Sequence, residues 1–190
     1  MKLEIFTIGN QEKDFLRKRQ ATMEQSKADL VMLLNTDIVV SGFKQAIAHF
    51  KDPKLFAVTF SPRSSNTGEV KRVECANGGS SIYKRAIWNK IGGIDLAFEP
   101  YWFDDVDYSK RASDAGYHIL EDGNIEVKQV SQMGTEIIKK DFHGQLIYWR
   151  NFFLYLEKHR IPMAKRHLLV PVFWPFIIWA HVRYNKFHGK

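Results

Sequence analysis

The sequence predicts an α/β fold with a helical appendage at its C-terminal end. Short strand-like segments alternate with helix-like segments, as expected for a sheet covered by helices. The run Leu30–Leu34 is continuously apolar and too short for a helix, which suits a strand buried on both faces. With 190 residues and 45% apolar content, the chain can form one sizeable core. We expect residues 1–142 to form this core and residues 143–190 to form the appendage.

The first third of the chain is expected to contain three strands and two helices. The strands are expected at 3–8, 30–34 and 55–60, and the helices at 11–28 and 41–51. Ser41 is the expected N-cap of the second helix, whose inner side carries Phe43, Ile47 and Phe50.

The remaining elements are shorter and are separated by turn-forming residues. After a polar loop at 61–68, strands are expected at 70–75, 117–120 and 125–130, and helices at 83–91 and 143–159. Gly92–Gly93 is expected to end the helix that starts at Tyr83. The glycines of Asn77–Ser81 are expected where the backbone approaches another group closely.

The stretch Tyr101–Asp107 carries three aromatic rings followed by three carboxylates within four positions. A helix start stabilises a nearby negative charge by about 0.3–1 kcal/mol, and Gly116 is expected to end this helix. One acid is enough for a cap, and Asp104 and Asp107 share a helical face while Asp105 points elsewhere. The cluster therefore indicates a general base or a metal site, with a well-capped helix as the alternative.

The excess of positive over negative charge lies in the last 48 positions of the chain. Residues 1–142 carry 20 basic and 20 acidic side chains, whereas residues 143–190 carry 8 and 1, which gives the net charge of +7. A nucleic-acid-binding protein is expected to spread basic residues over its folded domain, so this distribution favours a membrane surface or an acidic partner.

The segment 161–190 resembles an interfacial membrane anchor. Leu168–Ala180 has no charged residue and contains two tryptophans, but a bilayer span takes about 20 apolar residues and two prolines interrupt the run. A core-packed segment or a dimer contact is the alternative. The single Cys75 and the lack of a signal-peptide core at the start predict a reducing, cytoplasmic location, peripheral to the inner membrane face.

The motifs, in their order along the chain, resemble the family 2 glycosyltransferases of the GT-A fold, especially the rhamnosyltransferase-like branch. The similarity covers about residues 3–160 and depends on the ordered set, because each motif alone is weak. The segments that carry it are Arg19–Ala21, Leu33–Asp37, Gly78–Arg85, Gly92–Asp95, Asp104–Asp107 and Tyr148–Asn151.

This resemblance implies an enzyme with a mixed sheet that transfers a sugar, with inversion, from a UDP- or dTDP-sugar to a glycan or lipid-linked acceptor. Asp37, assisted by Asn35, would hold Mg²⁺ or Mn²⁺, and Asp105 would be the catalytic base with Asp104 beside it. The remaining implied contacts are Gln20, Gly78 and Gly79 on the donor side, and Tyr101, Trp102 and Asp107 on the acceptor side.

Two departures from the family pattern leave alternatives open. The chain opens at what would be the family's third strand, so the first strand–helix–strand unit would have to come from self-association or a partner chain. The family often has a metal-binding His after the acidic helix, where this chain has Val127–Gln132, and Gln129 is a poor substitute for imidazole. The alternatives are an inactive or accessory glycosyltransferase-like domain and a basic membrane-associated scaffold.

Overall fold

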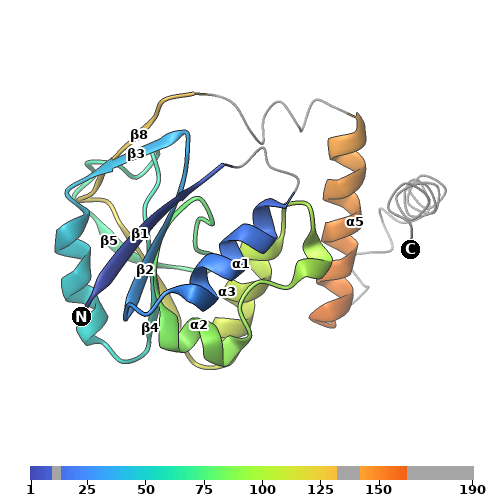
Figure 1. Ribbon diagram of the computed structural model, residues 1–190, viewed down its shortest axis with the longest axis horizontal. Coiled ribbons are helices and arrows are strands. Elements are labelled where there is room, and N and C mark those ends of the chain that lie inside the picture. The colour runs from blue at the N-terminus through green and yellow to red at the C-terminus, as the bar shows by residue number, and fades with distance from the viewer. Residues whose placement is uncertain (10–13, 132–141, 162–190) are drawn as a thin grey trace.

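The computed structural model describes residues 1–9, 14–131 and 142–161 (Figure 1). The described strands form a six-stranded sheet in the order β1-β2-β6-β4-β7-β5 and a separate two-stranded sheet of β3 and β8. The six-stranded sheet consists of β1 (Leu3–Ile8), β2 (Leu30–Asn35), β6 (Ser80–Lys84), β4 (Leu55–Thr59), β7 (His118–Asp122) and β5 (Val70–Val73).

This sheet is mixed. β1 runs parallel to β2 and β4 runs parallel to β7, whereas β6 is antiparallel to both β2 and β4 and β5 is antiparallel to β7. The predicted α/β class is therefore confirmed, together with the mixed sheet that the resemblance implied.

Helices cover one face of the sheet, and a 3₁₀ helix and the small sheet cover the other. The first face packs against α1 (Phe15–Gln25), α2 (Arg85–Ile91) and α3 (Asp104–Asp114). The second face packs against the 3₁₀ helix η1 (Phe43–Lys51) and the ribbon of β3 (Ile38–Ser41) and β8 (Glu126–Gln129). A short 3₁₀ turn, η2 (Leu96–Phe98), precedes α3, and α5 (Phe142–Lys158) stands beside the α1–α3 layer (Figure 1).

Strand β2 separates the two cores, as the apolar run predicted. Val31 and Leu33 belong to the helix-side core, whereas Leu30 and Met32 belong to the core under η1. Strand pairing on both sides of β2 satisfies its backbone, so every side chain from Leu30 to Leu33 can be buried.

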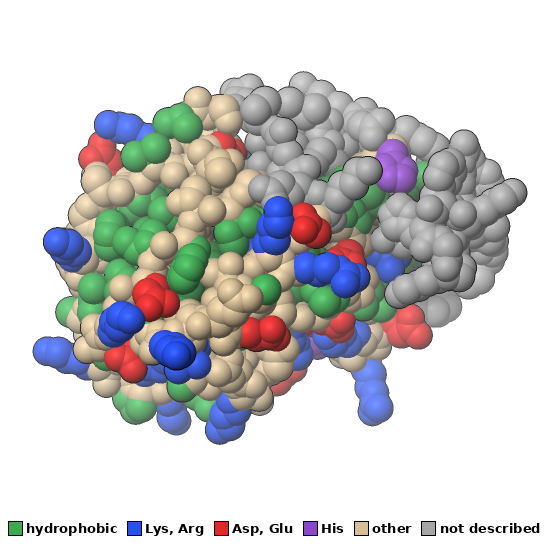
Figure 2. Space-filling model, in the orientation of Figure 1, with side chains coloured by type: hydrophobic (Ala, Val, Ile, Leu, Met, Phe, Trp, Pro, Cys, Tyr) green, Lys and Arg blue, Asp and Glu red, His purple; other side chains and the backbone are tan. Residues whose placement is uncertain are grey.

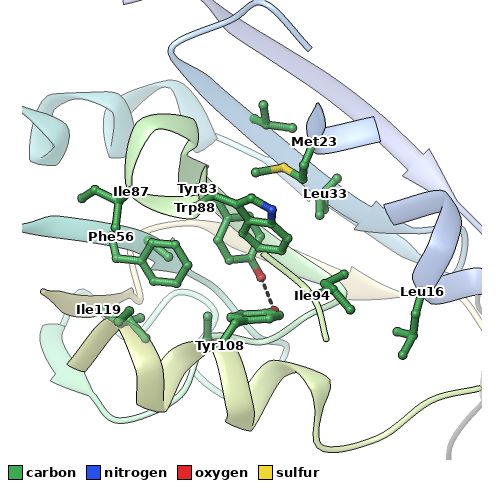
Figure 3. Packing of buried hydrophobic residues seen from close by; sticks show 14 of the residues in the cluster. Leu16, Met23, Leu33, Phe56, Tyr83, Ile87, Trp88, Ile94, Tyr108 and Ile119 are labelled. Carbon is green, nitrogen blue, oxygen red and sulfur yellow. Dashed lines mark hydrogen bonds between the residues drawn. The ribbon is translucent and has the colours of Figure 1, made fainter. Parts of the chain in front are cut away.

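The centre of the helix-side core is aromatic (Figure 3). The rings of Phe56, Tyr83, Trp88 and Tyr108 pack with centroid distances between 5.0 and 6.3 Å. The hydroxyls of Tyr83 and Tyr108 lie 2.8 Å apart and satisfy one another. This contact fixes α3 against β6, because Tyr108 comes from the helix and Tyr83 from the strand.

Two local expectations were wrong. Ser41 does not cap a helix: it ends β3, its hydroxyl donates to Glu126 Oε2 at 2.7 Å, and Gly42 at φ 76° precedes η1. Tyr83 does not start a helix, because it is buried in β6 between β2 and β4, and the helix begins at Arg85. In both cases strand pairing with a distant segment overrides the local pattern.

The expected membrane anchor at 161–190 lies, beyond residue 161, outside the described residues. Among the described helices, none has both the length and the apolar character needed to cross a bilayer. On the face shown in Figure 2, acidic and basic side chains are interspersed over the described surface.

Candidate active site

The candidate site begins where β2 ends beside the start of β6. The backbone N–H of Asn35 donates to the carbonyl oxygen of Gly79 at 2.8 Å. The Asn35 side chain fills the space next to this glycine, since a Cβ on Gly79 would lie 2.2 Å from Asn35 Nδ2. Asn35 and Gly79, both expected site residues, are therefore neighbours, and a side chain at position 79 would displace the Asn35 amide.

A buried arginine connects this point to the acidic helix. The Arg19 side chain on α1 is 3% exposed, and its Nη1 lies 3.2 Å from Asp104 Oδ2. Its Nη2 donates to the carbonyl oxygen of Gly78, and a Cβ on Gly78 would lie 2.9 Å from Arg19 Nη1. The guanidinium also stacks over the Phe15 ring at 5.2 Å. Arg19 thus joins α1, the Gly78–Gly79 loop and the start of α3.

Asp104 and Asp105 lie side by side at the start of α3 but differ in exposure. Asp104 is buried, whereas Asp105 is partly exposed. Burial, with a smaller contribution from Asp105, raises the pKa of Asp104 to about 7 against the opposing effect of Arg19. Burial also raises the pKa of Asp105, opposed by Arg19 and by the N–H groups of Val106 and Gly78. Both carboxyl groups therefore have raised pKa values, and the partly exposed one, Asp105, binds a proton more readily than an ordinary carboxylate does.

Asp37 lies in the turn after β2, and its side chain is buried except for 7% of its surface. One carboxylate oxygen, Oδ2, accepts a hydrogen bond from Gln129 Nε2 at 3.3 Å, while Oδ1 is buried and has no hydrogen-bond partner among the residues that the structure describes. A buried carboxylate oxygen without a donor is costly unless a cation or water meets it. This oxygen fits a hard divalent cation. Among the described residues, however, no group of three or more His, Cys, Asp or Glu side chains surrounds a common point.

The aromatic loop before α3 is held by a side chain from α5. The fully buried Asn151 donates through Nδ2 to the carbonyl oxygens of Phe98 at 2.6 Å, Tyr101 at 2.7 Å and Trp102 at 3.2 Å. Trp102 and Phe103 both have left-handed backbone angles, with φ of 77° and 66°. The expected acceptor residues Tyr101 and Trp102 thus lie on a strained loop, directly before Asp104 and Asp105.

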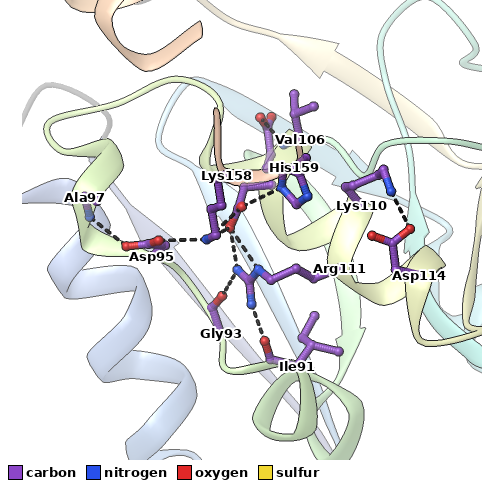
Figure 4. Close-up of polar contacts among 12 residues, drawn as sticks. Ile91, Gly93, Asp95, Ala97, Val106, Lys110, Arg111, Asp114, Lys158 and His159 are labelled. Atoms are coloured by element: carbon purple, nitrogen blue, oxygen red, sulfur yellow. Dashed lines mark hydrogen bonds and ion pairs between the residues drawn. The ribbon is translucent and has the colours of Figure 1, made fainter. Parts of the chain in front are cut away.

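Asp107, expected on the acceptor side, instead lies in a buried ionic cluster that attaches α5 to α3. Its carboxylate is fully buried and lies 2.7 Å from Arg111 Nη2, 2.8 Å from Lys158 Nζ and 2.9 Å from His159 Nε2. Figure 4 shows these three side chains converging on one carboxylate. Both oxygens of this carboxylate are thus engaged by side chains of the chain itself, and its acceptor-side role stays a prediction.

Gln20, expected on the donor side, contacts the loop after α2. Its Oε1 accepts from the Ile94 N–H at 2.8 Å, and its Nε2 donates to Glu24 at 2.7 Å.

Cys75 lies close to the acidic pair, but burial raises the pKa of its thiol to about 12, so it is a protonated thiol at neutral pH.

The comparisons with known proteins identify the fold. No family model matches the chain. Over 76% of this chain, the structure resembles GalNAc-T7 in complex with UDP, GalNAc and Mn²⁺, with a TM-score of 0.59 and 10% identity, over 34% of that protein. It also resembles a mannosyltransferase from Pyrobaculum calidifontis in complex with GDP-Man and Mn²⁺, with a TM-score of 0.53 and 16% identity, over 90% of this chain and 48% of that one. The chain therefore has the GT-A type of glycosyltransferase fold.

The curated relatives are distant and longer than this chain. Proteins of Mycobacterium bovis and Mycobacterium tuberculosis, both described as uncharacterized, are 28% identical over 110 residues, which is 57% of this chain and 38% of theirs. A lipid droplet localized protein of Caenorhabditis elegans is 28% identical over 76 residues, 39% of this chain and 18% of its own length. The chain thus spans well under half the length of these relatives.

Sequence reasoning did not assign three residues that are central to the described site. Arg19 and Asn151 belong to motifs noted above, but the local sequence did not show which backbone and carboxylate groups they meet. Gln129 was judged only as a poor metal ligand, whereas the structure places its amide against Asp37.

Proposed function

We propose that this chain is an inverting glycosyltransferase that moves a sugar from a nucleotide-sugar donor to a hydroxyl of a glycan or lipid-linked acceptor. The observation that carries the proposal is the junction at the end of β2, where Asn35, Gly79 and Gly78 meet Arg19, Asp104 and Asp105. On a fold of the GT-A type, this junction combines groups suited to a diphosphate with groups suited to proton transfer.

Asp105 is the proposed general base. It takes the proton of the acceptor hydroxyl while that oxygen bonds to the anomeric carbon, and the bond between this carbon and the diphosphate oxygen breaks. The products are the glycosylated acceptor and a nucleoside diphosphate, with inverted configuration at the anomeric carbon. The raised pKa of Asp105 makes it a stronger base than an ordinary carboxylate.

Asp104 and Arg19 are proposed to support this base. The buried ion pair fixes the start of α3, and the positive charge of Arg19 limits how far the pKa values of both acids rise. Asp105 Oδ1 accepts from the Val106 N–H at 2.9 Å, but a role as helix caps alone does not account for the contact of Asp104 with Arg19. Phe103 occupies the N-cap position, and the carboxylate of Asp104 is directed to Arg19.

Asp37, with Asn35 assisting, is proposed to hold Mg²⁺ or Mn²⁺. The free buried oxygen of Asp37 supports this assignment, and both glycosyltransferases of similar fold named above were solved with Mn²⁺. When bound, the cation would neutralise the charge that develops on the leaving diphosphate. Because the described residues supply few ligands, the diphosphate and water would complete the coordination shell.

Calorimetric titration tests the donor site. We expect saturable, Mn²⁺-dependent binding of at least one nucleotide among UDP, dTDP and GDP, and we expect Asp37→Ala to abolish it. Folded protein that binds none of the three would overturn the proposal for this chain alone. That result would favour an accessory glycosyltransferase-like domain that needs a partner chain to bind nucleotide.

A further inference from the structure

Asp37 differs from the other buried acids in what surrounds it. Asp104 lies against Arg19, Asp122 lies 3.0 Å from His49 Nε2, and Asp107 is met by three basic side chains. Among the described residues, no basic side chain pairs with Asp37, and its only side-chain hydrogen bond is to the neutral amide of Gln129. Within the described part of the chain, the buried Asp37 carboxylate therefore has no basic side chain beside it.

The ribbon of β3 and β8 brings Gln129 to this carboxylate. Ile38, the residue after Asp37, pairs with Gln129 in the antiparallel register. The next residue of that chain segment, Val130, donates its N–H to the backbone carbonyl of Asp37 at 2.9 Å. Asp37 is therefore held at two points by the end of β8, through its backbone and through Oδ2.

This arrangement leaves one oxygen of Asp37 available. An amide N–H can donate to a carboxylate oxygen without neutralising the carboxylate. By engaging Oδ2, Gln129 restricts rotation of the carboxylate, and no described residue donates to the buried Oδ1. A lysine or arginine in its place would neutralise the carboxylate and repel an incoming cation.

We propose that Gln129 is a positioning residue for Asp37: it orients the carboxylate so that Oδ1 meets a divalent cation while the full negative charge is kept. The inference rests on the proposed function, because it assumes that Asp37 holds the cation. Groups that hydrogen-bond to metal-binding carboxylates commonly change metal affinity by 10–100-fold when they are removed.

Direct measurement of Mn²⁺ binding tests this role. Free Mn²⁺ is measured by electron paramagnetic resonance in mixtures with UDP, dTDP or GDP, and protein-free mixtures give the background. Gln129→Leu keeps the size of the side chain but removes its donor. Lys128→Leu is the matched control, because Lys128 is exposed, pairs with Glu126 and is not bonded to Asp37.

We expect Gln129→Leu to weaken Mn²⁺ binding by at least about tenfold, Lys128→Leu to leave it unchanged, and Asp37→Ala to abolish it. Circular dichroism melting checks that all variants are folded. Equal Mn²⁺ affinity of Gln129→Leu and the unchanged protein would overturn the role of Gln129 and leave the metal role of Asp37 intact. Failure of the unchanged protein to bind Mn²⁺ would overturn the metal assignment itself, and the inference with it.

Discussion

Arg19 and Asp104 form a buried ion pair across 85 positions of sequence, with 3.2 Å between Nη1 and Oδ2. Both side chains are almost completely excluded from solvent, so neither charge is solvated by water in the folded protein. The free energy of such a pair depends on keeping both partners, because removing one leaves a buried charge without compensation.

Replacement of Arg19 is therefore expected to destabilise the fold strongly. Arg19→Met should lower the free energy of unfolding by about 3–5 kcal/mol, the range for a buried pair that loses one partner. The measurement is urea unfolding at pH 7. Arg17→Met is the control, because Arg17 pairs with Glu99 at the surface and its loss should have little effect. Similar losses for the two variants would contradict the account of Arg19.

The raised pKa of Asp104 predicts how stability depends on pH. An unfolded chain has an aspartate pKa near 4, whereas burial holds the pKa of Asp104 at about 7 in the fold. Between these values the folded protein binds more protons than the unfolded chain, so stability should fall as pH rises from about 4 to about 7. The slope from this group is up to about 1.4 kcal/mol per pH unit.

Asp104→Asn should remove this part of the slope, because the amide does not titrate. Urea unfolding of both proteins at pH 5 and pH 7 measures the difference, and titrating groups other than the neighbouring Asp105 contribute equally to both. If the variant lost as much stability as the unchanged protein over this interval, Asp104 would not be the group that titrates.

Asn151 is expected to control the order of the aromatic loop. Asn151→Ala removes the hydrogen bonds that its amide donates to the buried carbonyl of Phe98 and the part-buried carbonyl of Tyr101, at a cost of about 1–3 kcal/mol. The left-handed residues Trp102 and Phe103 should then relax, because the contact that holds the strained loop is gone.

Amide hydrogen exchange over residues 98–105 is the direct readout for this loop. We expect these amides to exchange faster in Asn151→Ala than in the unchanged protein. In the control Glu157→Ala, at an exposed position of α5, their exchange rates should not change. Unchanged protection of the loop in Asn151→Ala would show that α5 does not hold it.

The sequence predicted those parts of the fold that follow from local patterns. Hydrophobic periodicity and residue composition correctly placed three features. These are the apolar run at β2, the strand at β4 and the acids at the start of α3. The face shared by Asp104 and Asp107, with Asp105 apart from them, also follows from helical geometry, and the structure buries the first two and not the third.

What the sequence did not predict depends on contacts between distant segments. The expectation that Ser41 caps a helix failed because its hydrogen-bond partner, Glu126, lies 85 positions away in β8. The role of Asp107 depends on Lys158 and His159, more than 50 positions later, and that of Asn151 depends on carbonyl groups about 50 positions earlier. Such pairings are set by tertiary packing, which single-segment patterns do not contain.

The most direct test of the proposed chemistry is release of nucleoside diphosphate from a set of UDP-, dTDP- and GDP-sugars in Mn²⁺, compared between the unchanged protein and Asp105→Asn. The account predicts turnover of at least one donor by the unchanged protein. It predicts a loss of about 10²–10⁴-fold in Asp105→Asn, with nucleotide binding retained, because a general base typically contributes that much. Equal turnover by the two proteins would contradict the assignment of Asp105 as the base of a glycosyltransferase.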